Sequence, residues 1–399
     1  MLNPEMVREA TRLTRAGQLV EATALLQRML RGDGAHAATR GGAVHVKPAR
    51  LEPPTLDLKA NVVEERESGP STQATSVQRR KRHLPFGMKN LSGVSLPGPV
   101  GRTPPSKGDI APDGTRFVAA TFANAAGSRT YKLFIPSRAD RAPRPLVVML
   151  HGCTQSPDDF AAGTRMNFLA EEQNCFVVYP EQPRGANQAK CWNWFRTGDQ
   201  QRDGGEPSLI AGITRKIMRE HPIDPKRVYV AGLSAGGAAA AIMGATYPDL
   251  YAAVGVHSGL ACGAASDLPT ALTAMRQGSG PRGIAKACSP VPTIVFHGDR
   301  DTTVHPDNGE RVLDPPGEAE GQQAKVVRGR VPEGHAYTRT ILADGGGVAI
   351  SEHWSVHGAG HAWSGGSPAG SYTDPRGPDA TREMLRFFLE HSLASFTRR

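Results

Sequence analysis

The strongest chemical signal in the sequence is a serine between small residues, Gly232-Leu233-Ser234-Ala235-Gly236. The motif follows the apolar run Val228–Ala231 and precedes an alanine-rich segment, 235–247, so we expect a tight turn from a strand into a helix. Such a turn is crowded and admits only small side chains beside the serine. A phosphate-binding loop is the alternative for a glycine-rich turn, but its G-x-x-x-x-G-K-[ST] pattern is absent. The sequence therefore predicts that Ser234 is a nucleophile.

A serine hydroxyl needs a base to take its proton and a carboxylate to orient that base. Both residue types occur downstream, at the ends of predicted strands. One strand leads into a loop with Asp299 and Asp301, and a later strand leads into a glycine-rich turn with His357 and His361. Asp301 lies further into its loop, where it can turn toward a histidine, so it is favoured as the acid and Asp299 is the alternative.

Three histidines at a spacing of four residues, His353, His357 and His361, would form a metal-binding face on a helix. Gly358 and Gly360 argue against a helix there, so we expect no metal site. The predicted chemistry requires no metal and no organic cofactor. Two other histidines at strand ends, His257 and His297, are expected to be structural.

A tetrahedral intermediate also needs two N–H donors for its oxyanion. The backbone N–H of Ala235, directly after the serine, is one candidate. The second is expected in the loop His151–Gln155, where Cys153 would donate through its backbone N–H. A cysteine nucleophile is not expected at this position, because no helix start would activate the thiol.

Apolar runs alternate with helical patterns after Pro112, which predicts one α/β domain over residues 113–399 with a doubly wound, mostly parallel sheet. Period-two alternation predicts an antiparallel pair at its start, over Arg116–Phe122 and Arg129–Ile135. The buried strands are expected at 146–150, 176–179, 228–231, 251–256, 293–296 and 350–355. The helices are expected near 158–173, 206–221, 235–247, 267–278 and 379–393.

The front of the chain has a different composition. Residues 1–31 show helical apolar spacing broken at Gly17, which predicts an amphipathic helical hairpin. Residues 32–112 are rich in Pro, Gly and basic residues, which is typical of a disordered linker. Residues 1–112 contain 17 Lys and Arg against 10 Asp and Glu, a net of +7 in a chain whose total is +9. This region is therefore a candidate for docking to a surface or a partner protein.

Several classes of protein are excluded or disfavoured. No stretch approaches the roughly 18 apolar residues of a transmembrane helix. Charged residues interrupt every apolar run near the N-terminus, so we expect no signal peptide and a cytoplasmic location. The basic run Arg79–Arg82 has no interleaved aromatic residues, so nucleic acid is not an expected partner.

Five segments together resemble the polyhydroxybutyrate (PHB) depolymerase family of esterases, which is related to feruloyl and acetylxylan esterases. The resemblance covers about residues 113–393 and is carried by His151–Gln155, Cys191–Phe195, Gly232–Gly237, His297–Val304 and Gly358–Gly366. It implies the α/β-hydrolase fold, with Ser234 as nucleophile, Asp301 as acid and His361 as base. It also implies that the substrate is an ester, with 3-hydroxybutyrate oligomers or other short acyl esters expected. The alternative is a feruloyl or acetyl ester of a plant cell-wall polysaccharide.

Residues beside these motifs are candidates for an acyl or alcohol pocket: His151, Trp192, Trp194 and Trp363. Core packing is an equally good interpretation for Trp194. Two disulfides are hypothesised, Cys153 with Cys191 and Cys262 with Cys288, which would leave Cys175 as a thiol in a buried strand.

Overall fold

The computed structural model describes residues 61–64, 105–138, 142–278, 291–313 and 323–393. The predicted hairpin and most of the predicted linker lie outside these residues and stay predictions. Two parts of the linker segment have regular structure, strand β1 (Asn61–Glu64) and helix α3 (Lys107–Ile110). Ile110 is buried, and its carbonyl accepts a hydrogen bond from the side chain of Asn167. The folded domain therefore begins before the predicted boundary at residue 113.

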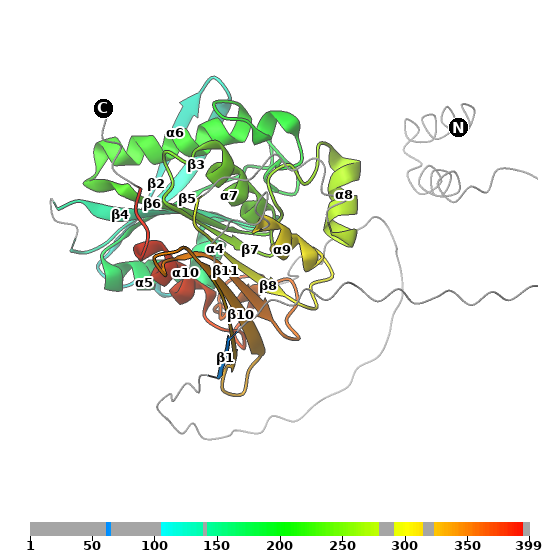
Figure 1. Cartoon of the computed structure of the whole chain (residues 1–399). Coiled ribbons are helices and arrows are strands. Elements are labelled where there is room, and N and C mark those ends of the chain that lie inside the picture. Colours follow the sequence, from blue (N-terminus) through cyan, green and yellow to red (C-terminus); the bar gives the residue numbers. More distant parts are fainter. Residues whose placement is uncertain (1–60, 65–104, 139–141, 279–290, 314–322, 394–399) are drawn as a thin grey trace, which may run out of the picture. The chain divides into compact units, whose positions relative to one another are not determined.

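Within the described residues, eleven strands form one sheet in the order β1-β9-β10-β11-β8-β7-β6-β4-β5-β3-β2 (Figure 1). The six strands from β11 to β5 in this order are mutually parallel. Their bounds are Ala349–Val356 (β11), Thr293–Gly298 (β8), Ala253–His257 (β7), Ile223–Leu233 (β6), Arg144–Leu150 (β4) and Phe176–Pro180 (β5). Because parallel strands place their carboxyl ends at one edge, the loops after β4, β6, β8 and β11 meet there.

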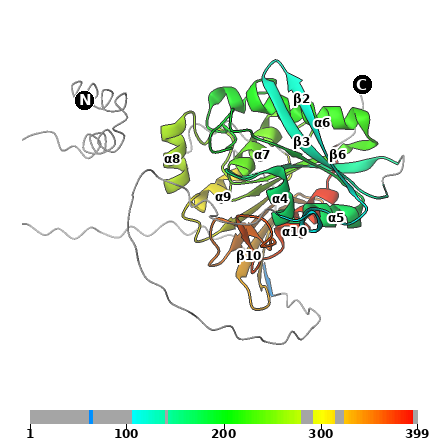
Figure 2. The same ribbon diagram turned by 180° about the vertical axis from the view of Figure 1, so that it is seen from behind.

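Helices cover both faces of this sheet (Figures 1 and 2). Helices α6 (Gly205–Glu220) and α7 (Ala235–Thr246) pack on one face, and α4 (Pro157–Thr164), α5 (Met166–Gln173) and α10 (Ala380–Leu389) pack on the other. Two further helices, α8 (Leu268–Gln277) and α9 (Asp307–Val312), and the short 3-10 helix Thr197–Gln200 complete the set. The helix predicted over 158–173 is two helices, because Arg165 has a φ of +56° and breaks the chain direction.

The core follows the alternation of side chains along the strands. On β4, Val148 belongs to the cluster beneath α6 and α7, whereas Val147 belongs to the cluster beneath α4, α5 and α10. Both residues are fully buried. Strands buried on both faces need apolar residues at every position, which is why these strands are visible in the sequence as continuous apolar runs.

The antiparallel pair predicted at the start of the domain is confirmed as β2 (Arg116–Asn124) and β3 (Gly127–Ile135). A second antiparallel pair, β9 (Gln323–Arg330) and β10 (Ala336–Ala343), was not predicted. Its strands carry arginines and a lysine between their apolar residues, so they lack the continuous apolar run by which the other strands were found. A further short pair joins β12 (Trp363–Ser364) to β13 (Thr373–Asp374).

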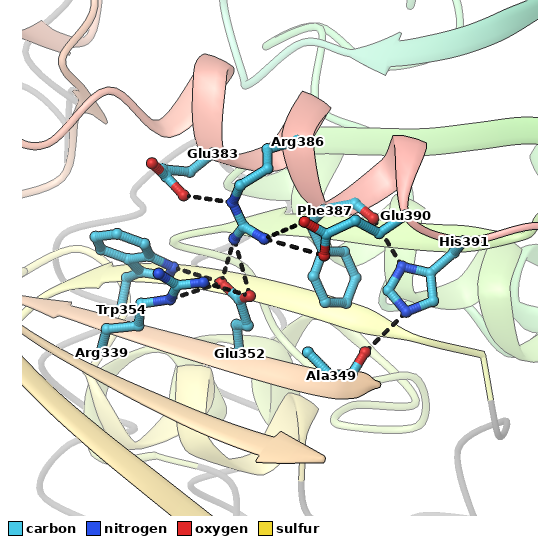
Figure 3. A network of polar contacts seen from close by, with 9 residues as sticks. All are labelled: Arg339, Ala349, Glu352, Trp354, Glu383, Arg386, Phe387, Glu390 and His391. Carbon is cyan, nitrogen blue, oxygen red and sulfur yellow. Dashed lines mark hydrogen bonds and ion pairs between the residues drawn. The ribbon is translucent and has the colours of Figure 1, made fainter. Parts of the chain in front are cut away.

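The last helix is tied to the sheet by a buried carboxylate (Figure 3). Glu352 of β11 has no exposed surface and accepts hydrogen bonds from Arg339 of β10, from Arg386 of α10 and from the indole of Trp354. Burial alone would raise the pKa of Glu352, but Arg339 and Arg386 outweigh it and lower that pKa. These contacts hold α10 against β10 and β11, the strands that precede the loop of His361.

In the part of the chain that the structure describes, no helix is both long and apolar enough to cross a bilayer.

Candidate active site

Ser234 lies in the turn between β6 and α7, with φ +57° and ψ −119°. A positive φ is strained for a residue with a side chain. The neighbouring glycines are required by close backbone approaches: a Cβ on Gly232 would lie 2.2 Å from the carbonyl oxygen of Gly236, and one on Gly236 would lie 2.0 Å from that of Leu150. The predicted strand–turn–helix is therefore present, and it places Ser234 at the carboxyl end of β6.

The carboxylate of Asp301 lies in the loop after β8 and is buried. Its Oδ2 is 2.7 Å from Nδ1 of His361 and 3.4 Å from Nε2 of His297, while its Oδ1 accepts the backbone N–H groups of Thr303 and Val304 at 2.9 and 2.8 Å. Burial by itself would raise the pKa of Asp301, but the hydrogen bonds from His297 and His361 hold it well below its usual value. Asp301 is thus an anion that can orient an imidazole.

Asp299 makes a separate pair. Its Oδ2 lies 3.0 Å from Nδ1 of His357, and its Oδ1 accepts the backbone N–H of Gly358 at 2.7 Å. Both side chains of this pair are exposed by about two fifths, at 39% and 43%. The structure therefore brings Asp301 to His361 and Asp299 to His357, and it does not gather His353, His357 and His361 around one point.

His257, at the end of β7, links the serine turn to the loop that carries His361. Its carbonyl accepts the N–H of Ser234 at 2.8 Å, and its Nε2 accepts the N–H of Ser364 at 2.9 Å. Burial, together with His297 and His361 nearby, lowers the pKa of His257 to about 3. His257 is a buried, neutral connector, which agrees with the structural role expected for it.

The loop after β4 forms a four-residue turn closed by the N–H of Gln155 on the carbonyl of Gly152, at 3.3 Å. Thr154 has a φ of +67° and donates its N–H to the carbonyl of Ala189. Among the described residues, the backbone N–H of Cys153 makes no contact with a backbone acceptor, nor does that of Ala235 in the first turn of α7. Two uncommitted donors of the predicted kind are therefore present.

The four pocket candidates lie in the interior. Trp192 and Trp363 are 0% and 1% exposed, and their indole N–H groups bind the carbonyl of His151 and the hydroxyl of Thr381. His151 is also buried, accepts the N–H of Gln182 at its Nε2, and has its pKa lowered by burial to about 4. Trp194 packs edge-on against Phe195. All four side chains are therefore buried in this structure, and their role in a pocket stays a prediction.

One of the two hypothesised disulfides is confirmed, between Cys153 and Cys191. Cys288 lies outside the described residues, so the pairing of Cys262 with Cys288 stays a prediction. Cys175 is a buried thiol directly before β5, and burial raises its pKa to about 12. The confirmed disulfide ties the turn of Cys153 to the segment that carries Trp192.

Sequence reasoning missed Glu206, which organises the segment after Cys191. Its side chain is buried and accepts the backbone N–H of Asn193 at 2.7 Å, the Asn193 amide at 2.6 Å and the amide of Gln182. Burial raises the pKa of Glu206, although the bonds from Asn193 oppose it. The one available signal was a single acidic residue at the start of a predicted amphipathic helix, which is usually a solvated position.

The central parallel sheet, the helices on both of its faces and the strained serine turn after β6 define the α/β-hydrolase fold. The structure of an acetyl xylan esterase from Aspergillus awamori matches it with a TM-score of 0.50 and 19% identity, over 69% of this chain and 99% of that one. Residues 129–315 match the family profile described as "Esterase PHB depolymerase". The resemblance found in the sequence is thereby confirmed.

Curated relatives support the same assignment. Poly(3-hydroxyalkanoate) depolymerase C of Paucimonas lemoignei is 33% identical over 55% of each chain. A probable acetylxylan esterase A of Neosartorya fischeri is 30% identical over 46% of this chain and 54% of its own length. Feruloyl esterase B of Thermothelomyces thermophilus is 26% identical over 53% of this chain and 77% of its own. The chain spans about half the length of the first two relatives. One of the three is named as a depolymerase and two as esterases.

Proposed function

We propose that this chain hydrolyses carboxylic esters, with Ser234 as nucleophile, His361 as base and Asp301 as the acid that orients His361. The observation that carries the proposal is the 2.7 Å contact between Asp301 and His361. The loop of His361 and the strained turn of Ser234 are both hydrogen-bonded to His257. A buried carboxylate on Nδ1 leaves Nε2 as the nitrogen that can take the serine proton.

In the proposed reaction, Ser234 Oγ attacks the ester carbonyl carbon while its proton passes to Nε2 of His361. The oxyanion accepts hydrogen bonds from the backbone N–H groups of Ala235 and Cys153. The tetrahedral intermediate then expels the alcohol, which takes the proton from His361, and an acyl-Ser234 ester remains. Water then attacks the carbonyl carbon of this ester while its proton passes to Nε2 of His361. The second tetrahedral intermediate releases the carboxylic acid, and Ser234 Oγ takes the proton back from His361.

The proposed substrates are 3-hydroxybutyrate oligomers or other short-chain acyl esters. Support comes from the match of residues 129–315 to the PHB depolymerase profile and from the relative named poly(3-hydroxyalkanoate) depolymerase C. The second candidate is an acetyl or feruloyl ester of a plant polysaccharide, which is favoured by the relatives named acetylxylan and feruloyl esterases.

The test is hydrolysis of p-nitrophenyl butyrate, 3-hydroxybutyrate trimer, acetylated xylan and methyl ferulate by the full chain, beside the Ser234→Ala variant. We expect the variant to lose about 10⁴-fold or more in kcat on every substrate that the wild type cleaves. Equal turnover by the variant would remove the mechanism. A preference for acetylated xylan or ferulate over the trimer would replace the polyester substrate with the second candidate.

A further inference from the structure

Gln155 is a buried amide, 2% exposed, and both of its polar atoms are hydrogen-bonded. Its Oε1 accepts the backbone N–H of Gly152 at 2.8 Å. Its Nε2 donates to Oδ2 of Asp159 and to the carbonyl of Ser371, both at 3.0 Å. Since Ser371 is 216 residues away in the chain, Gln155 joins the turn after β4 to two distant parts of the fold.

The geometry of the turn explains why this amide matters for Cys153. Gly152 and Gln155 are the first and last residues of the turn, and they are bonded twice: the N–H of Gln155 to the carbonyl of Gly152, and the side chain of Gln155 to the N–H of Gly152. Cys153 is the second residue. Because the Gly152–Cys153 peptide is trans and its carbonyl accepts the closing bond, the N–H of Cys153 points away from that bond. The side chain of Gln155 therefore helps to set the direction of the Cys153 N–H.

The far end of Gln155 is itself held in place. Ser371 donates its N–H to Oδ1 of Asp159 at 2.9 Å and its hydroxyl to Oδ2 of the same carboxylate. Asp159 lies in the first turn of α4, so the amide rests on a helix and on the segment before β13. Asp159 is the charged side chain bonded to Gln155 within the described residues.

An amide meets both requirements at this position. It accepts from Gly152 with its oxygen and donates to a carboxylate and a carbonyl with its nitrogen. An ionised glutamate would place negative charge against Asp159, and a methionine of similar volume would make neither bond and leave the Gly152 N–H unsatisfied.

We infer that Gln155 is a positioning residue that orients the Cys153 N–H toward the oxyanion. The inference rests on the proposed function, because it assigns Gln155 a part in the same reaction. A donor directed at a developing charge acts on the transition state and little on the bound ester. Loss of the amide should therefore lower kcat and leave KM nearly unchanged.

The experiment compares Gln155→Met and Gln155→Glu with the wild type, using p-nitrophenyl butyrate and the full chain. The matched control is Gln200→Met, because Gln200 also bridges two backbone groups, accepting the N–H of Gly263 at 2.9 Å and donating to the carbonyl of Ala265 at 2.8 Å. We expect Gln155→Met to lose about 10-fold or more in kcat, against about 10² to 10³ for outright loss of an oxyanion donor. Its KM should stay within about 3-fold, since uniform binding is not removed.

The glutamate variant supplies the rescue. A protonated carboxyl can accept from Gly152 and donate to Asp159 or Ser371 as the amide does. Its kcat relative to the wild type should therefore rise as the pH is lowered from 8 to 6. A circular dichroism melt of each variant establishes that the variant is folded. If Gln155→Met does not fold, the test rests on Gln155→Glu. A ratio of its kcat to that of the wild type that does not change with pH overturns the inference.

Three other results overturn it as well. They are a folded Gln155→Met with the kcat of the wild type, a rise in KM as large as the fall in kcat, and the same loss of kcat in Gln200→Met. Failure of the proposed function is recognised separately. In that case the wild type and Ser234→Ala have equal turnover, and no Gln155 variant is needed to see it.

Discussion

Nδ1 of His361 lies 2.7 Å from Oδ2 of Asp301, although 60 residues of chain separate them. Two residues before Asp301, Asp299 makes the corresponding contact with His357, at 3.0 Å. The two pairs bridge the same two loops and differ in burial, since the carboxylate of Asp301 has no exposed surface and that of Asp299 is 39% exposed. They form a natural matched comparison between an imidazole oriented inside the fold and one held at its surface.

The first prediction uses this comparison. Asp301→Asn should lower kcat on p-nitrophenyl butyrate by about 10⁴-fold, because an amide at this position favours the wrong tautomer of His361. Asp299→Asn should keep kcat within a few fold, because His357 is not part of the proposed triad. Steady-state kinetics of both variants is the measurement. A large loss in Asp299→Asn with wild-type turnover in Asp301→Asn would exchange the roles of the two carboxylates.

The sequence predicted those parts of the fold and site that local crowding or burial encodes. Strands buried on both faces must be apolar at every position, so β4 and β6 were found as runs. The turn at Ser234 needs glycines at 232 and 236, because their Cβ positions are occupied by backbone carbonyls. Chain order and strand ends located the two loops. Asp301 was favoured over Asp299 because it lies further into its loop and because of the family resemblance, and its role as the acid stays a prediction.

Features that depend on distant partners were not predictable in this way. Gln155 acts through Ser371, and Glu206 acts through Asn193 and Gln182, and none of these contacts has a spacing pattern in the chain. The same limit applies to Trp192 and Trp363. Their positions beside motifs favoured a pocket wall, and only the packing of the folded chain shows that both rings are buried.

A second prediction concerns the stability of the fold at acidic pH. His257 and His151 each accept a backbone N–H at Nε2, and burial lowers their pKa values to about 3 and about 4. In the unfolded chain each of these histidines binds a proton near pH 6.5, whereas in the native state it does not. Their contribution to the free energy of unfolding is therefore fully present above that pH. It should be lost progressively as the pH falls from about 6.5 toward 4.

The measurement is the free energy of unfolding from urea titrations at pH 7.5, 6 and 5. In His257→Gln, the free energy of unfolding should fall less steeply as the pH is lowered. The variant lacks one buried side chain that takes up a proton when the chain unfolds. His305→Asn is the control, because the side chain of His305 is 41% exposed, and it should leave the slope as it is in the wild type. A wild-type stability that does not change from pH 7.5 to 5 would contradict the assignment of neutral buried histidines.

A third prediction tests the serine turn itself. In Gly236→Ala, the new Cβ would lie 2.0 Å from the carbonyl oxygen of Leu150, and no flexible side chain is available to move aside. We expect a loss of about 3 kcal/mol or more in the free energy of unfolding, together with loss of turnover. Gly185→Ala is the control, because a Cβ there meets nothing within 4 Å. Urea denaturation of both variants is the check, and equal stabilities would refute the close approach.

The fourth prediction addresses the carboxylate that anchors the last helix (Figure 3). Glu352 has no exposed surface and accepts two bonds at 2.8 Å from Arg386, which also contacts Glu383 and Glu390. Arg386→Met leaves this buried charge with Arg339 as its remaining cation, so the free energy of unfolding should fall by about 3 to 5 kcal/mol. The control is Arg382→Met, because the side chain of Arg382 lies on the same helix and is exposed. It should change the free energy of unfolding by about 0.5 kcal/mol or less.

The double variant Glu352→Leu/Arg386→Met separates a buried charge from lost packing. Removing both partners also removes the unpaired carboxylate, so the double variant should be more stable than Arg386→Met alone. Arg339 keeps its contact with the ring of Trp354, 5.0 Å from the guanidinium carbon to the ring centroid, and its side chain is 20% exposed. Urea titrations of the wild type, Glu352→Leu, Arg386→Met and the double variant give the coupling energy directly. Additive losses would mean that Arg386 stabilises α10 through its packing rather than through the charge of Glu352.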